Sequence, residues 1–135
     1  MATITRGELA KRCAVNFETV RYYERQGLIA TPDRNASNYR VYDEETVRRI
    51  LFIKRAKDVG FTLREIQDLL ALRVRRGARC GDVVARADAK IADIDARIRS
   101  LTDMRRSLVA LTEQCEGGDA SISECPILDA FSASP

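Results

Sequence analysis

The sequence predicts a mainly α-helical protein: a winged helix-turn-helix domain, then a long helix that forms an antiparallel coiled coil with a second copy, then a short C-terminal loop. Three observations predict this class. Two short helical segments flank a turn between residues 6 and 26, and the stretch from Asp82 to Gln114 contains neither proline nor glycine. Three cysteines, Cys80, Cys115 and Cys125, lie at the two ends of that stretch.

The N-terminal segment has the pattern of two helices around a turn. Residues 6–13 are expected to form the first helix, with Leu9 and Ala10 inward. Asn16 is a favourable N-cap for a second helix that Gly27 ends. Phe17, Val20 and Tyr23 would face the core, and the outward side chains would be Thr19, Arg21, Tyr22 and Arg25. This is the outline of a helix-turn-helix, with a helical hairpin that has a solvated face as the alternative.

A wing and two connecting helices are expected next. The turn-rich run Pro32 to Asn38 precedes an alternating run, Tyr39 to Tyr42, which is typical of a strand. Together they predict a two-stranded wing with Arg34 and Arg40 near a phosphate backbone. Asp43 is expected to cap a helix that reaches about Asp58, and Thr62 with Glu65 forms a capping box for another.

The long helix carries one narrow apolar seam. Its apolar residues recur at steps of three and four from Val84 to Leu111, close to a coiled-coil pattern, and its other faces are charged. Such a helix cannot bury its seam alone, so we predict a homodimer; packing on its own domain is the alternative. A helix of this length spans roughly 50 Å. Cys80 therefore cannot meet Cys115 in one chain, whereas in an antiparallel pair it lies beside Cys115 and Cys125 of the other chain.

The amino-acid composition limits the classes of function that the chain can have. The net charge of +3 hides a basic first part, because residues 1–79 hold 17 Lys and Arg against 10 Asp and Glu, while residues 80–135 hold 6 against 10. This division fits a nucleic-acid-binding head on a non-binding stalk. The chain has no histidine and no evident catalytic pairing, so we expect no enzyme and name no catalytic residue. No apolar run suits a membrane span or a signal peptide, so we expect the cytoplasm, where the four cysteines would be thiols or metal ligands.

Four runs of residues closely resemble the MerR family of transcription regulators: Thr19 to Ile29, Asn38 to Tyr42, Phe52 to Arg55, and Gly60 to Ile66. Cys115 and the run Glu124 to Leu128 resemble the metal-sensing branch, above all the mercury-responsive regulators. The resemblance implies a dimer that binds operator DNA within a promoter, holds RNA polymerase inactive without metal, and distorts the DNA when metal binds. By position it implies DNA contacts from Arg21, Tyr22, Tyr23, Tyr39, Arg40 and Lys54.

The metal expectation rests on Cys80, Cys115 and Cys125. Soft thiolates favour Hg(II), Cd(II), Pb(II) and Cu(I). In the family, a cysteine at the start of the dimer helix accompanies sensors of divalent ions, and zinc sensors add a histidine that this chain lacks. We therefore expect Hg(II) as the effector, with Pb(II), Cd(II) or Zn(II) as alternatives, and a thiol redox switch as the alternative of another class. Cys13 is expected to be a small buried apolar residue.

These inferences divide the chain into three regions. Residues 1–79 are expected to be the winged helix-turn-helix DNA-binding region with its connecting helices. Residues 80–115 are the expected dimerisation helix, and residues 116–135 the expected metal-binding loop and C-terminal turn.

Overall fold

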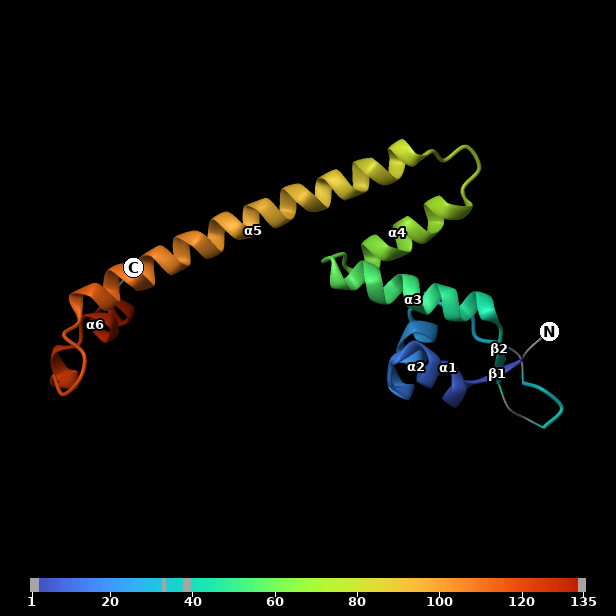
Figure 1. Ribbon diagram of the computed structural model, residues 1–135, viewed down its shortest axis with the longest axis horizontal. Helices are drawn as coiled ribbons and strands as arrows, with labels where there is room; N and C mark the ends of the chain where they lie inside the picture. Colours follow the sequence, from blue (N-terminus) through green and yellow to red (C-terminus); the bar gives the residue numbers. More distant parts are fainter. Residues whose placement is uncertain (1–2, 33, 38–39, 134–135) are drawn as a thin grey trace. The chain divides into compact units, whose positions relative to one another are not determined.

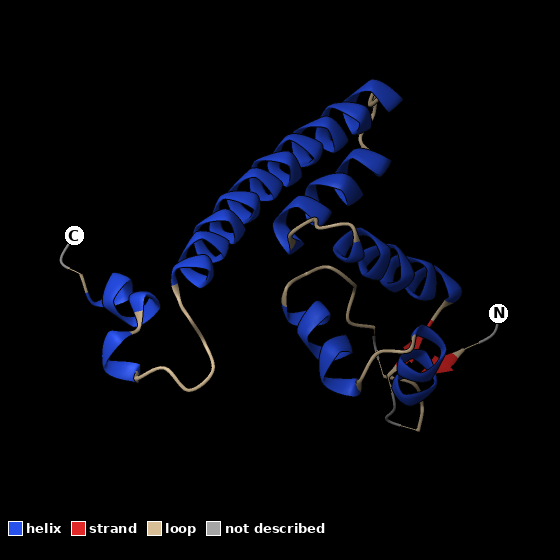
Figure 2. Ribbon diagram, turned by 60° about the vertical axis from the view of Figure 1, so that its left-hand side comes forward, coloured by secondary structure: helices blue, strands red, loops and turns tan. Residues whose placement is uncertain are grey.

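The computed structural model describes residues 3–32, 34–37 and 40–133. It forms two units, Met1–Ala87 and Asp88–Pro135, which are described separately. Unit 1 carries four helices, the start of a fifth and a small sheet, and unit 2 carries the rest of the fifth helix and a C-terminal turn (Figure 1). Helices dominate the described part of the chain, as the sequence predicted, and the strands are short (Figure 2).

The first two helices form the expected helix-turn-helix. Helix α1, Arg6–Cys13, begins after Thr5, whose hydroxyl accepts a hydrogen bond from the Glu8 amide at 3.2 Å. Helix α2, Phe17–Arg25, begins after Asn16, whose side chain accepts from the Thr19 amide at 2.7 Å. Each cap satisfies an amide that the first helical turn leaves without a partner.

The small sheet differs from the expected wing. Strand β2, Val41–Tyr42, pairs antiparallel with β1, Ile4–Thr5, so that Ile4 lies opposite Tyr42. Among the described residues of the wing, an antiparallel bridge between Arg34 and Arg40 joins the two sides. A two-stranded wing from local sequence alone was therefore only partly right, because the strand after the loop finds its partner at the N-terminus.

Two further helices complete unit 1. Helix α3, Glu44–Asp58, is capped by Asp43, whose carboxylate accepts from the Thr46 amide at 3.0 Å. Helix α4, Leu63–Val74, begins with the predicted capping box, in which Thr62 and Glu65 each accept from the other's amide. Both starts agree with the sequence because caps depend on residues within one helical turn.

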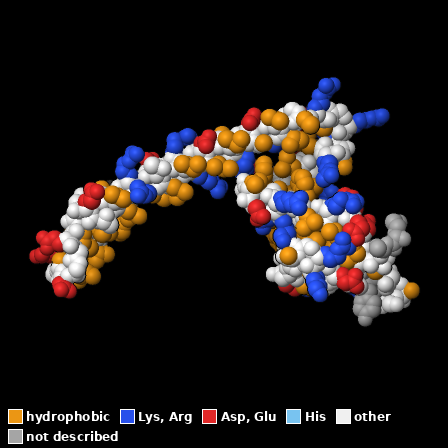
Figure 3. Space-filling model, in the orientation of Figure 1, with side chains coloured by type: hydrophobic (Ala, Val, Ile, Leu, Met, Phe, Trp, Pro, Cys, Tyr) orange, Lys and Arg blue, Asp and Glu red, His pale blue; other side chains and the backbone are white. Residues whose placement is uncertain are grey.

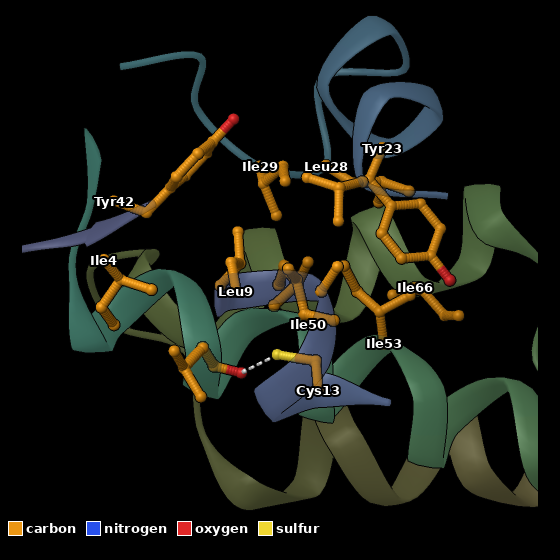
Figure 4. Close-up of a cluster of buried hydrophobic side chains, with 14 residues drawn as sticks. Ile4, Leu9, Cys13, Tyr23, Leu28, Ile29, Tyr42, Ile50, Ile53 and Ile66 are labelled. Atoms are coloured by element: carbon orange, nitrogen blue, oxygen red, sulfur yellow. Dashed lines mark hydrogen bonds between the residues drawn. The ribbon is translucent and has the colours of Figure 1, made fainter. Parts of the chain in front are cut away.

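The core of unit 1 draws on every one of its complete helices. The side chains with no exposed surface include Leu9 of α1, Val20 of α2, Ile50 and Ile53 of α3, and Ile66 of α4. Leu28, which follows α2, is also fully buried, and Figure 4 shows it among these side chains. The expectation that Phe17 faces this core is wrong: 46% of it is exposed, and it packs instead under the Arg6 guanidinium, 5.1 Å from the ring centre.

The fifth helix, α5, runs unbroken from Cys80 to Gln114. Its start is capped by Asp82, whose carboxylate accepts from the Arg79 amide at 2.8 Å. After α5 come a 3-10 turn, η1, Ile122–Glu124, and a short helix, α6, Pro126–Ser132. No helix among the described residues is long and apolar enough to cross a membrane.

Candidate functional site

The first candidate site is a hollow of about 360 Å³ in unit 1, which we call the arginine hollow. Five arginines, one glutamate and one threonine line it: Arg6, Arg21, Glu24, Arg25, Thr31, Arg34 and Arg40. The arginines come from α1, α2 and the wing, so three separate segments contribute charge to one concave surface. Guanidinium groups are suited to bidentate contact with phosphate.

The α2 arginines are open to solvent. Arg21 is half exposed and lies 3.4 Å from Glu18 in the preceding turn, a weak pair at an open surface. Arg25 lies over the ring of Tyr22, 5.9 Å from its centre, and Tyr22 is itself exposed. These side chains are free to turn toward a ligand, because neither contact buries them.

Arg40 has a second role within the wing. Its guanidinium donates to the Pro32 carbonyl oxygen at 2.9 Å, and its backbone forms the bridge to Arg34. Arg40 therefore holds the two sides of the wing together while it lines the hollow.

Not all residues predicted to contact DNA lie at this surface. Tyr23 is in the core with 3% of its surface exposed, where Figure 4 shows its ring beside Ile53 and Ile66. Thr19 is half-buried, and its hydroxyl donates to the Asn16 side chain at 2.8 Å within the helix cap. Tyr39 lies outside the described residues. A DNA contact from any of the three stays a prediction.

Lys54 is also engaged inside unit 1. Its ammonium group donates to the carbonyl oxygens of Cys13 at 2.7 Å and Ala14 at 3.2 Å, at the C-terminal end of α1. These carbonyls have no partner within the helix and carry the negative end of its dipole, so a cation is favourable there. The contact ties α3 to the turn of the helix-turn-helix.

Sequence reasoning missed a group of three side chains beside the hollow. Arg6 donates to the Tyr42 hydroxyl at 3.0 Å and to the Glu24 carboxylate at 3.2 Å, and the Tyr42 hydroxyl donates to the same carboxylate. We call this group the Arg6–Glu24–Tyr42 triad. The three residues are 18 and 36 positions apart, so no local pattern could have paired them.

The environment of the triad raises the pKa values of Tyr42 and Arg6. Burial raises the pKa of Tyr42, and the hydrogen bond to Glu24 raises it further. For Arg6, burial lowers the pKa, but the hydrogen bond to Tyr42 and the charge of Glu24 outweigh it, so the guanidinium stays charged. The triad is thus an ion pair closed by a neutral phenol.

The second candidate site is a hollow of about 320 Å³ in unit 2, which we call the thiol hollow. Cys115 and Cys125 both line it, together with Glu116, Glu124 and the loop between them. Gly117 and Gly118 have positive φ angles of 71° and 58°, a conformation that reverses the chain after α5 and favours glycine. The loop after α5 therefore brings the two cysteines to one hollow.

The thiols of the hollow are held by local structure. Cys115 follows α5 directly, and its amide donates to the Thr112 carbonyl oxygen at 3.2 Å. Cys125 lies between η1 and α6, and its amide donates to the Ile122 carbonyl oxygen at 3.3 Å. Both residues are only partly exposed. Their backbone positions are therefore set before any ligand binds.

Cys80 belongs to unit 1, where it is the first residue of α5 and is exposed. Among the residues that the structure describes, no three His, Cys, Asp or Glu side chains are close enough to hold a metal ion. One described chain therefore offers a pair of thiols in the thiol hollow and a separate thiol at the start of α5.

Cys13 is buried, as expected. Its thiol contacts the Val47 carbonyl oxygen at 3.9 Å, the dashed line in Figure 4. Burial raises the pKa of the Cys13 thiol. A buried thiol that is held in its neutral form is a core residue, not a metal ligand.

A helix-turn-helix unit with an arginine-lined hollow defines a DNA-binding regulator. Two family models match the chain: "MerR HTH family regulatory protein" over residues 4–72 and "MerR, DNA binding" over residues 47–111. The chain therefore belongs to the MerR family, as its sequence motifs predicted. Both models describe regulators, not enzymes.

Similar proteins cover nearly the whole chain. The mercuric resistance operon regulatory protein of Bacillus cereus is 46% identical over 91% of this chain and 92% of its own. The regulator CueR of Salmonella typhimurium is 34% identical over 93% and 89%. The structure of the transcription regulator PbrR691 from Ralstonia metallidurans CH34 in complex with lead(II) has a TM-score of 0.84, is 38% identical and covers 96% of this chain and 99% of that one.

Proposed function

We propose that this protein is a metal-responsive regulator of transcription that binds promoter DNA as a homodimer and senses Hg(II) through Cys80, Cys115 and Cys125. The observation that carries the proposal is the thiol hollow: two cysteines, ten positions apart, line one small cavity, and a third lies at the other end of α5. The regulator acts in the cytoplasm, where promoter DNA is found.

DNA binding is assigned to the arginine hollow. Arg21, Arg34 and Arg40 contact phosphates from two sides, α2 and the wing, and Tyr22, whose ring lies against Arg25 of the same hollow, adds a hydroxyl. Tyr39, Thr19, Tyr23 and Lys54 complete the proposed set by family position. Phosphate contacts fix the orientation of a protein on the duplex, and base contacts specify the sequence.

Dimerisation is assigned to the apolar seam of α5. In the described chain these side chains are exposed: Ile91, Ile94, Ile98, Leu101, Met104 and Leu108. Figure 3 shows hydrophobic side chains in a row along α5. An apolar row of this length on a charged helix is stable only when a partner covers it, and a second copy in antiparallel orientation is the simplest partner.

The antiparallel pair supplies the missing thiol. A helix of 35 residues is about 50 Å long, so Cys80 at its start cannot join Cys115 at its end. In the dimer, Cys80 of one copy meets Cys115 and Cys125 of the other, which gives one three-thiol site at each end. Three thiolates bind a soft ion and carry a net charge of about −1 with a divalent metal.

Mercury is proposed over lead, cadmium and zinc on two grounds. The B. cereus relative, by its name a regulator of a mercuric resistance operon, shares 46% of the aligned residues. The donors are thiols without a histidine, which suits Hg(II) better than tetrahedral Zn(II). Lead is the second candidate, because the PbrR691 structure is a lead(II) complex and resembles this chain closely.

Regulation follows from coupling the two sites. Metal binding at the ends of α5 acts on the position of the two DNA-binding units. The metal-bound dimer distorts operator DNA so that RNA polymerase can start transcription of a metal-resistance promoter. Without metal, the dimer binds the operator and represses transcription from the promoter.

The central test is an anaerobic titration of the reduced protein with Hg(II), Pb(II), Cd(II) and Zn(II) in excess small thiol, followed by thiolate-to-metal absorption. We expect Hg(II) to be retained, and Cys80→Ser, Cys115→Ser and Cys125→Ser each to lose it. Cys13→Ala is the matched control and should retain Hg(II). Retention of Pb(II) as well would point to a broader sensor. Failure to retain any metal would refute the metal site and favour the redox switch.

A mixed dimer tests whether the site is shared. Chains with Cys80→Ser are combined with chains carrying Cys115→Ser. A site shared between chains leaves one complete site in each mixed dimer, so about half of the normal metal capacity per dimer should return. A site within one chain leaves none, and zero recovered capacity would contradict the antiparallel arrangement.

A further inference from the structure

The Arg6–Glu24–Tyr42 triad joins three segments of unit 1 at the edge of the arginine hollow. Arg6 is the first residue of α1, Glu24 lies in the last turn of α2, and Tyr42 ends β2. The Glu24 side chain is 9% exposed and that of Arg6 20% exposed. Arg6 also packs over Phe17, so it contacts both ends of α2. Hydrogen bonds between charged groups are stronger in such partly buried surroundings.

An acidic residue such as Glu24 is unexpected in the arginine hollow if the only role of the hollow is to attract DNA. It is the single acidic residue among the described residues that line the arginine hollow. A carboxylate there repels the phosphates that the five arginines attract, and thereby weakens binding to any duplex. The function of Glu24 must therefore come from its hydrogen bonds within the triad and not from an interaction of its charge with DNA.

Those contacts connect the two groups of arginines. Arg21 and Arg25 are on α2, three residues before and one residue after Glu24. Arg40 immediately precedes β2, which ends at Tyr42, and bridges to Arg34. The triad fixes the end of α2 to β2 through side-chain hydrogen bonds, so it fixes the spacing between the helix arginines and the wing arginines.

We propose that Glu24 is a positioning residue, which acts with Arg6 and Tyr42 to set the spacing between α2 and the wing and so increases selectivity for one DNA sequence. A fixed spacing favours duplexes whose groove shape matches it, whereas a mobile wing accepts many. The inference rests on the DNA-binding part of the proposed function and goes beyond it.

Two substitutions separate positioning from charge. Glu24→Gln keeps the shape of the side chain and removes its negative charge. If Glu24 acts only through its charge, Glu24→Gln should bind every duplex more tightly. If Glu24 acts by positioning, Glu24→Gln should bind the preferred duplex more weakly. Tyr42→Phe keeps the ring in the core and changes no charge. If only the charge of Glu24 matters, Tyr42→Phe should have no effect on DNA binding. If positioning matters, Tyr42→Phe should weaken binding to the preferred duplex, as Glu24→Gln does.

The experiment uses a duplex that the unaltered full-length protein enriches from a random pool, and a scrambled duplex of equal length. The dissociation constants for both are measured at one salt concentration, and their ratio is the specificity. We expect the specificity to fall about tenfold in both variants, the loss of one charge-assisted hydrogen bond. Because both substitutions act through one contact, the specificity of the double variant should be no lower than that of the less specific single variant.

Glu8→Gln is the matched control. Glu8 is exposed on α1, and its side chain forms no hydrogen bond or ion pair recorded among the described residues. Glu8→Gln removes the same charge as Glu24→Gln but outside the triad, so the specificity should stay unchanged.

The ratio also distinguishes positioning from stability. A purely structural defect lowers the folded fraction, which affects both duplexes by the same factor and leaves the ratio unchanged. An unchanged ratio in the two variants therefore overturns the proposal. If Glu24→Gln does not fold, Tyr42→Phe decides by the same criterion. If the unaltered protein binds DNA but enriches no duplex, sequence-selective binding is refuted and the positioning role falls with it; if it binds no DNA, the proposed function fails as well.

Discussion

Leu101 lies near the middle of the exposed seam of α5, and its replacement tests the dimer directly. In the described chain 62% of Leu101 is exposed, so most of its apolar surface is available to a partner. We expect Leu101→Ala to weaken self-association of the protein while leaving unit 1 folded, because Leu101 is outside that unit.

The size of the effect follows from the exposed area. Complete burial of a leucine side chain contributes about 1.5–3 kcal/mol, and the exposed share of Leu101 corresponds to roughly 1–2 kcal/mol of this. A two-fold dimer buries the residue twice, which gives roughly 2–4 kcal/mol. The dimer dissociation constant should therefore rise about 30-fold to 700-fold.

Sedimentation equilibrium over a range of protein concentrations measures this constant. Arg99→Ala is the control, because Arg99 is exposed and lies about 200° around the helix from Leu101. Arg99→Ala should leave the constant within about threefold of the unaltered value, since surface charges contribute little. Equal constants for the two variants would refute the assignment of the seam to dimerisation.

Three further predictions concern unit 1. Arg21→Ala should weaken binding to DNA and reduce the slope of log K against log salt by about 0.9, one phosphate contact, whereas Lys57→Ala, outside the arginine hollow, should not change it. Lys54→Met should lower the free energy of unfolding by about 1–2 kcal/mol in urea titrations, because the carbonyls at the end of α1 lose their ammonium partner; no difference from Lys57→Met would disprove this. Burial raises the pKa of the Cys13 thiol and so favours the neutral thiol in the folded state; the free energy of unfolding in urea titrations should therefore fall as pH rises above the ordinary value of 9.0, and Cys13→Ala should flatten this decline.

Features decided by neighbouring residues were predictable from the sequence. The caps at Asn16, Asp43 and Thr62 and the long α5 depend on side chains within one or two helical turns, and all appear in the structure. Gly117 and Gly118 adopt the positive φ angles of the reversal after α5, a local conformation that favours glycine. The family motifs predicted a fold that the comparisons confirm, because those motifs are themselves local.

Features that depend on distant residues were decided only by the tertiary structure. β2 pairs with the N-terminal β1, because Ile4 and Tyr42 are brought together by the core. Lys54 lies against the end of α1, where its charge meets carbonyls 40 and 41 residues away.

The same reasoning applies to the α2 surface. The family resemblance implied DNA contacts from both Tyr22 and Tyr23, whereas helical periodicity placed Tyr23 toward the core. Packing against α3 and α4 does bury Tyr23 and leaves Tyr22 exposed. Sequence therefore determined which segments are helices, where they begin, and which residue types could bind phosphate or a soft metal. The packing of segments far apart in the chain decided which of those side chains reach a shared surface, since burial and long-range hydrogen bonds depend on contacts that no local pattern encodes.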